Sequence, residues 1–269
     1  MRIRVLARGA LAAALLALGA CTDLSAVRDF SRLSAGTADY RVLVDRYGSF
    51  GNRLAYYRER PVDVGDRAAQ REGLLALHTA LAGYMTALGD LADDAVVSVS
   101  TAPLAEAAEK AALLDAAMRP KVEALGNVVA RAVTAGWGQR EIGRVIEAGN
   151  APVQDITARL IRFAEAQGDD DAQERLAIRT AYGRILENPR SDPAARRLVF
   201  ERREEHLAKL DARAATRNAF IAAMRKIAEG HQALHDGRDR LSTAEVQRQI
   251  RAVNNDLRTI GRALQAAIF

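Results

Sequence analysis

Apolar side chains recur every three or four residues along most of the chain, a spacing that few folds can accommodate. The clearest series is Leu74, Leu77, Leu81, Tyr84, Leu88 and Leu91. Residues at these steps share one face of an α-helix, and an apolar face must be buried against another element. The chain has only 6 Pro in 269 residues and lacks the short alternating Val, Ile and Thr runs typical of strands. The sequence therefore predicts an all-α fold, an elongated antiparallel helical bundle of about five to six long helices.

Two further stripes support a bundle with coiled-coil-like packing. Leu104, Ala111, Met118 and Leu125 follow one another at steps of seven. The last stripe consists of Val246, Ile250, Val253, Leu257, Ile260, Leu264 and Ile268. We expect the last helix to be structural and to dock along the bundle through this stripe, because an exposed stripe of that length would be an interface.

Helix boundaries are predicted from caps and helix breakers. Ser242 with Glu245 fits a capping box, and Asp192 followed by Pro193 fits an N-cap with proline at the first helical position. The expected connections are 61–65, 94–103, 168–171, 188–193 and 236–240. The expected long helices are 38–59, 66–93, 103–135, 151–187 with an interruption near 168–171, 194–235 and 243–268.

The first residues have the pattern of an export signal. Arg2, Arg4 and Arg8 precede a short apolar stretch, which is followed by Leu18-Gly19-Ala20-Cys21. The apolar stretch is about half of the roughly 20 residues that a transmembrane helix needs. We therefore expect it to be cleaved from the mature protein.

The segment Leu18-Gly19-Ala20-Cys21 resembles the lipobox of bacterial lipoprotein precursors. The resemblance covers the signal and the anchor only, and the mature domain resembles no named family. It implies cleavage between Ala20 and Cys21, with diacylglycerol and acyl chains attached to Cys21 as the only expected cofactor. Two or three acyl chains hold a protein firmly to a membrane. Since Cys21 is the only cysteine, no thiol remains for a disulfide or a thiolate site.

The expected organisation is a signal peptide at 1–20, a lipid-anchored tether with a short helix at 21–36, and the bundle at 37–269. Three of the 39 Lys+Arg lie in the signal, which leaves 36 against 34 Asp+Glu, a net charge of +2. Both signs are interleaved and aromatic residues make up 5% of the chain, which argues against nucleic-acid binding.

His231 and His235 are the candidate metal ligands, because residues four apart share a helix face. The segment is superficially similar to the zincin helix, but Gln232 occupies the position of the general-base glutamate. A metal site also needs three or four converging ligands. We therefore predict no metal site, with a core histidine and a histidine at a helix C-terminus as the simpler interpretation.

Trp137, between two glycines and close to Arg140, is the candidate interaction site for a partner or a lipid headgroup. The alternative, which we favour, is that it caps one end of the core.

Two other clusters each have two interpretations. The aromatic residues Tyr40, Tyr47, Phe50, Tyr56 and Tyr57 are typical of a ligand cavity or, more often, of a core filled by large rings. The arginines Arg196, Arg197, Arg202, Arg203, Arg213 and Arg217 are typical of a surface for anionic groups, or of a solvated face with ion pairs four residues apart.

The residues show no catalytic signature, so we predict that the chain is not an enzyme. The favoured function is a lipid-anchored cell-envelope protein that acts by binding or scaffolding. The alternatives are a bundle that binds a small apolar ligand and, less favoured, a metal-binding protein using His231 and His235. We expect a membrane contact through the anchor and an envelope protein as partner. Because Thr22 rather than aspartate follows the cysteine, the resemblance implies the periplasmic face of the outer membrane.

Overall fold

The computed structural model describes residues 23–188 and 192–266. Within these residues the chain forms nine α-helices and two short 3-10 segments, with no strand. The α-helices are α2 (Ser25–Ala38), α3 (Val42–Gly48), α4 (Phe50–Arg58), α5 (Arg67–Ala92), α6 (Ala102–Leu114), α7 (Arg119–Thr134), α8 (Ile142–Leu186), α9 (Pro193–Asp236) and α10 (Ala244–Ala266). The fold is all-α, as the apolar stripes predict, with more helices than expected.

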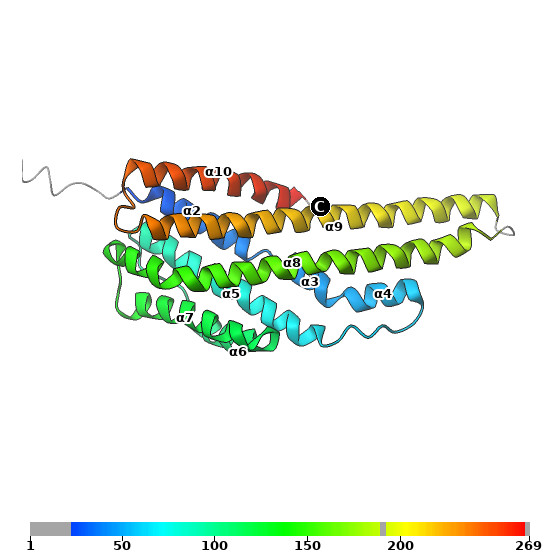
Figure 1. The fold of residues 1–269 in the computed structure, drawn as a ribbon, viewed down its shortest axis with the longest axis horizontal. Coiled ribbons are helices and arrows are strands. Elements are labelled where there is room, and N and C mark those ends of the chain that lie inside the picture. The colour runs from blue at the N-terminus through cyan, green and yellow to red at the C-terminus, as the bar shows by residue number, and fades with distance from the viewer. Residues whose placement is uncertain (1–22, 189–191, 267–269) are drawn as a thin grey trace, which may run out of the picture.

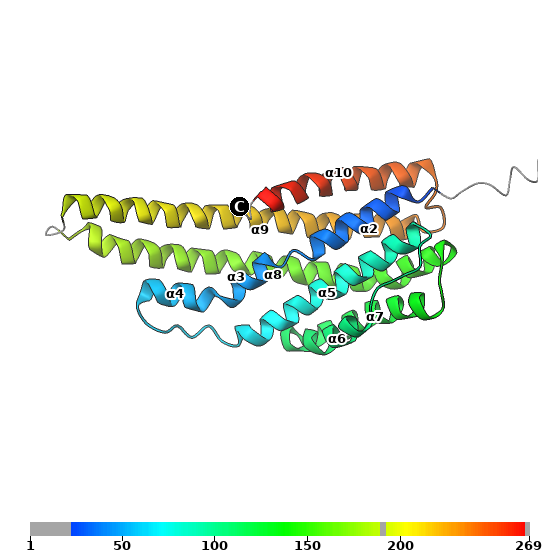
Figure 2. The same ribbon diagram turned by 180° about the vertical axis from the view of Figure 1, so that it is seen from behind.

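The long helices lie roughly along one direction and form an elongated bundle (Figures 1 and 2). α5 occupies the centre and packs against α2, α3, α6, α7 and α8. It is the one helix of the described residues long and apolar enough to cross a membrane, but 67% of its most apolar window is buried inside the bundle. Burial within the protein therefore accounts for its composition.

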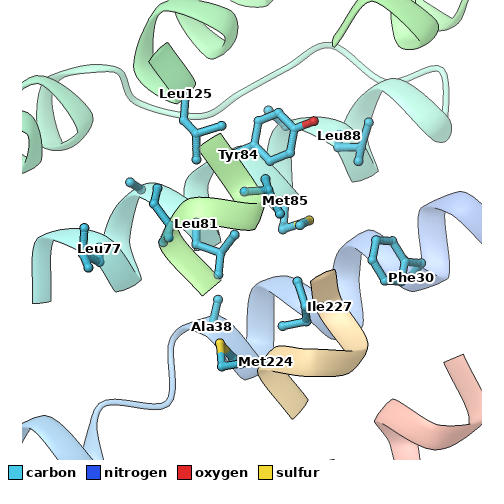
Figure 3. Close-up of a cluster of buried hydrophobic side chains, with 14 of the residues drawn as sticks. Phe30, Ala38, Leu77, Leu81, Tyr84, Met85, Leu88, Leu125, Met224 and Ile227 are labelled. Carbon is cyan, nitrogen blue, oxygen red and sulfur yellow. The ribbon is translucent and has the colours of Figure 1, made fainter. Parts of the chain in front are cut away.

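The main core forms where the stripes of several helices meet around α5. Leu77, Leu81 and Leu88 of α5 are fully buried, and Phe30 of α2 and Ile227 of α9 lie in the same cluster (Figure 3). A smaller second cluster contains Phe50, Leu54 and Ala177. Within residues 23–188 and 192–266 there are thus two separate apolar clusters, one large and one small.

The short N-terminal helix is part of this core. α2 runs through the expected boundary between residues 36 and 37, and Val27, Phe30 and Ala38 are all fully buried in the main cluster.

α10 docks as its stripe predicts. Its buried positions include Val246, Ile250, Val253, Leu257 and Leu264, and it packs against α9 and α2. Ile268 lies outside the described residues. The capping residue was misplaced by one position. α10 begins at Ala244, so Thr243 rather than Ser242 precedes it, and the Thr243 Oγ1 accepts from the Val246 N–H at 3.5 Å.

Two of the expected long helices are broken. The segment 38–59 is divided at residues 39–41 and again at Ser49, whose hydroxyl bonds to the carbonyls of Asp45 and Arg46. A hydroxyl that donates to carbonyls of the preceding turn competes with the backbone hydrogen bonds of a helix. The segment 103–135 is divided at the extended residue Asp115 and forms the hairpin α6–α7.

The break at Asp115 is explained by Pro120. In a continuous helix the proline ring would meet the carbonyl four residues earlier and would leave it without a donor. In the structure Pro120 lies in the first turn of α7, and the Asp115 carboxylate accepts from the Ala117 N–H at 3.0 Å. The predicted burial of the residues at steps of seven is nevertheless confirmed, because Leu104, Ala111, Met118 and Leu125 are all buried.

The opposite error occurs in α8. The predicted start at 151 and the predicted interruption at 168–171 are both wrong, because α8 runs without a break from Ile142 to Leu186. Pro152 lies inside it, where the carbonyl left without a donor belongs to the exposed Ala148 and can bond to water. Asp170 and Asp171 remain helical because arginines of other elements neutralise them.

Candidate functional site

α8 and α9 extend together beyond the main core, with α4 packed against α8. The last residues of these helices in the main core are Ala164 and Phe220. We call 165–186 of α8 and 193–218 of α9 the arm. Each side of the arm is roughly 35 Å long at 1.5 Å per residue. Asp192 caps the returning helix, accepting from the Ala195 N–H at 3.0 Å as predicted.

The described chain begins at the other end of the molecule. α2 starts at Ser25, at the end of the bundle opposite the tip of the arm (Figure 1). Cys21 and Ala20, the predicted lipidation and cleavage residues, lie outside the described residues. The N-terminal end, as we call it, also contains the segment 138–147 and the connection 237–243.

A cavity of about 410 Å³ opens at the N-terminal end. Its lining includes Leu24 and four arginines, which outnumber the acidic residues Glu147 and Asp239. The four arginines are Arg140, Arg144, Arg238 and Arg240. The lining of this cavity therefore contains more basic than acidic side chains.

The structure places Trp137 and Arg140 at this same end with different roles. Trp137 is partly buried against the main core, and its backbone N–H donates to the Ala132 carbonyl at 3.0 Å. Gly136 allows this turn, since its φ of 58° is left-handed. Arg140 is exposed and lines the cavity. Of the two candidate interaction residues, Arg140 is the accessible one.

His231 is a hydrogen-bonded residue of the core. Its Nε2 lies 2.8 Å from the Tyr84 hydroxyl and its Nδ1 lies 2.9 Å from the Asn150 Oδ1. Burial, and to a lesser extent the charge of His235, lowers the pKa of His231 to about 3. His235 lies near the end of α9 beside Asp236. Both ring nitrogens of His231 thus have protein partners, and no group of three or more His, Cys, Asp and Glu side chains converges within the described ranges.

The aromatic residues of the 40–57 segment pack rather than share one cavity. Tyr47 makes an edge contact with Phe163, with 5.2 Å between ring centroids. The Tyr57 hydroxyl lies 2.5 Å from the His206 Nδ1 on the arm, and burial raises the pKa of Tyr57 to about 12. Tyr56 is exposed. Tyr47 therefore packs against the main core, and Tyr57 holds α4 against the arm.

The arginines of α9 do not form one basic face. Arg197 and Arg202 make exposed ion pairs with Glu201 and Glu205. Arg213 and Arg217, by contrast, point toward α8 and pair with Glu174 and Asp171. Sequence reasoning missed this inward arrangement.

Arg213 and Arg217 belong to a charged layer between the main core and the second cluster. The layer consists of Arg46, Arg53, Arg67, Arg213 and Arg217 with Asp170, Asp171 and Glu174. Glu174 is 2% exposed and accepts from Arg53 and from Arg213 at 2.9 Å. A sequence signal was present, because Asp170 and Glu174 are four apart on α8 and Arg213 and Arg217 are four apart on α9.

The arm carries half of the large apolar side chains that are exposed in the described part of the chain. Leu176, Ile185, Leu198 and Phe200 are four of eight such residues, and Leu176 and Leu198 are 65% and 68% exposed. Isolated exposed apolar residues are ordinary, whereas their concentration on one element is typical of an interaction surface.

Comparisons of the chain with protein-family models, curated proteins and solved structures find no match. The described part defines an all-α bundle with a projecting two-helix arm.

Proposed function

We propose that this chain is a lipid-anchored protein of the cell envelope that acts by binding or scaffolding. The observation that carries the proposal is the position of the first helix. α2 begins four residues after Cys21 and lies at the end of the bundle opposite the arm. An acylated Cys21 would hold that end at the membrane and direct the arm away from it.

The arginines of the cavity at the N-terminal end support this orientation. Arg140, Arg144, Arg238 and Arg240 line the cavity there. A basic side chain near an anionic membrane surface contributes about 1 kcal/mol of attraction, and two acyl chains supply firm binding. We infer that this end faces the headgroups, and that the membrane is the periplasmic face of the outer membrane.

The arm is the element that we assign to partner binding. Its exposed apolar residues would be directed away from the membrane, toward other envelope proteins. The chain acts in this proposal as a spacer, without catalysis.

Fractionation tests the anchor. Cys21→Ser should move the chain from the membrane fraction to the soluble fraction with unchanged helical content. A Cys21→Ser chain that stays in the membrane fraction would contradict the lipid anchor.

Crosslinking in detergent-solubilised envelope tests the arm. The double variant Leu198→Ser and Phe200→Ser should lose a crosslinked partner that the wild type retains. The matched control is Leu113→Ser, because Leu113 is 52% exposed on α6, outside the arm. Equal crosslinking in all three proteins would remove the arm from the proposed function.

A second candidate function, binding of a small apolar ligand, is favoured by one observation. A groove of about 790 Å³ lies between α2 and α10 and is lined by Leu33, Tyr40, Leu257 and Leu264, among others. Its volume is in the range of small-molecule sites. A lipophilic fluorescent probe should bind to the wild type and more weakly to Leu33→Asn, and no binding to either would end this alternative.

A further inference from the structure

The charged layer contains more positive than negative groups. Each of its carboxylates is already engaged. Glu174 accepts from Arg53 and Arg213, while Asp170 accepts from Arg67 at 2.6 and 2.8 Å. Asp171 accepts from Arg217. Five arginines thus face three carboxylates, and Arg46 is the one without an ion pair among the described residues.

The surroundings of Arg46 are unfavourable for an unpaired cation. The side chain is half-buried, and burial is the largest cause that lowers its pKa. The charges of Arg213 and Arg53 lower it further, whereas Tyr40 and Asp171 act in the opposite direction. Burial and like charges both disfavour the charged form of Arg46, so an anion next to it would be stabilising.

A small cavity lies beside Arg46 within the charged layer. Arg46, Arg53, Arg213, Arg217 and Gln167 line it together with Asp170, Asp171 and Leu43. Its volume of about 10 Å³ is close to the roughly 10 to 15 Å³ needed for one water-sized particle. The cavity is far too small for an organic ligand.

Two of the residues that line this cavity each have a buried donor without an acceptor. These donors are the Arg46 Nη1 and the Nε2 of Gln167, a residue that is 8% exposed. Buried N–H groups in native proteins are normally hydrogen-bonded. Both atoms are donors, so the missing particle is one that accepts hydrogen bonds.

We propose that this cavity binds a single monatomic anion, with chloride as the occupant. A water molecule could accept from the two donors but would leave the excess positive charge uncompensated. An anion does both. Bound there, it would join α3 and α4 to α8 and α9 at the base of the arm.

Thermal unfolding in different sodium salts tests the site. The purified chain is measured in chloride, bromide and gluconate at equal ionic strength, because gluconate is too large for the cavity. At a halide concentration of about ten times the dissociation constant, chloride and bromide should each raise the thermal midpoint by about 3 to 6 °C relative to gluconate. Equal midpoints in all three salts would overturn the proposal.

Variants locate the effect. Arg46→Met and Gln167→Met should abolish the halide-specific shift. Arg58→Met is the matched control, because Arg58 is exposed on α4 and does not line the cavity, and it should retain the shift. A shift that survives in both cavity variants would place halide binding elsewhere and overturn the proposal.

A bromide-soaked crystal of the wild type gives a readout that does not depend on how the variants fold. The anomalous signal should show one bromide within hydrogen-bond distance of the Arg46 Nη1 and the Gln167 Nε2. Density for water without an anomalous peak would show that the cavity is only hydrated.

Discussion

At the residue scale, the interior depends on a few polar and small side chains that leave little room for substitution. The Tyr84 hydroxyl donates to the Val145 carbonyl at 3.2 Å and lies 2.8 Å from the His231 Nε2. One hydroxyl thus links α5, α8 and α9. His78 is likewise fully buried, and its Nδ1 lies 2.5 Å from the Ala38 carbonyl. These groups are neutral inside the protein, which makes its stability sensitive to acid.

Stability should fall as the pH falls below 6.5. Burial lowers the pKa of His78 to about 4 and that of His231 to about 3, whereas in the unfolded chain both lie near 6.5. The unfolded state therefore binds more protons between pH 6.5 and these lower values. The loss is roughly 1 kcal/mol per pH unit for each histidine.

Urea unfolding between pH 8 and 4.5 measures this loss. Above pH 6.5 both histidines are neutral in both states and contribute nothing. His231→Gln should remove the contribution of His231 and so reduce the slope below pH 6.5 by roughly 1 kcal/mol per pH unit. An unchanged slope would mean that His231 is not held neutral in the folded protein.

Two helical glycines should respond in opposite directions to the same substitution. A Cβ at Gly230 would overlap the ring of Phe30, whereas one at Gly261 would meet open space. Gly230→Ala should lower the free energy of unfolding by about 1 to 3 kcal/mol through overpacking. Gly261→Ala should raise it by up to about 1 kcal/mol, since alanine favours helix. Thermal unfolding of both variants checks the two signs, and two changes of equal sign would contradict the packing of α2 on α9.

At the element scale, the spacing of apolar residues identified which faces are buried but not where helices end. The stripe of α5 and that of α10 were recognised because they depend only on local periodicity. The hairpin α6–α7 was missed because a regular apolar stripe continues across Asp115 and hides the break that Pro120 requires. The continuity of α8 was missed for the opposite reason. Its carboxylates are neutralised by arginines up to 103 residues away in sequence, which no local pattern contains.

The same limit applied to the candidate sites. The histidine pair and Trp137 stand out in the sequence, yet the structure gives His231 and Trp137 packing contacts. The charged layer draws on five helices. Its members look like ordinary surface charges until those helices meet.

α10 should contribute strongly to stability through one face only. Leu257 is 1% exposed, whereas Arg258 makes an exposed ion pair with Asp29 at 3.2 Å. Leu257→Ala should lower the free energy of unfolding by about 2 to 5 kcal/mol. Arg258→Ala should change it by less than about 1 kcal/mol, because exposed pairs contribute little. Denaturant unfolding of both variants measures the difference, and negligible effects from both would mean that α10 is detached in solution.

At the scale of the whole molecule, the two ends of the bundle differ in their exposed apolar side chains. Arginines occur at both ends, whereas exposed Leu176, Leu198 and Phe200 lie on the arm. α9 alone has 44 residues, which corresponds to about 65 Å at 1.5 Å per residue. A chain anchored at one end would therefore present its arm far from the membrane.

Energy transfer to an acceptor dye in the bilayer tests this orientation. With Cys21 acylated, a cysteine at Arg140→Cys or Arg197→Cys is the one free thiol for a donor dye. The label at residue 140 should transfer energy efficiently and the label at residue 197 weakly, since about 60 Å of α9 separates the two ends. Equal efficiencies would mean that the bundle lies flat on the membrane.

The charged layer lies at the base of the arm, and this position determines how the arm can unfold locally. Beyond Ala164 and Phe220 the two helices contact chiefly each other and α4, so the arm can open from its tip without disturbing the main core. Amide hydrogen exchange should be fastest near residues 186 and 193 and should slow toward the charged layer. A partner bound at the tip would suppress this fraying along the whole arm. Amide exchange at the base of the arm would then slow on binding, with no change in the average positions of the helices.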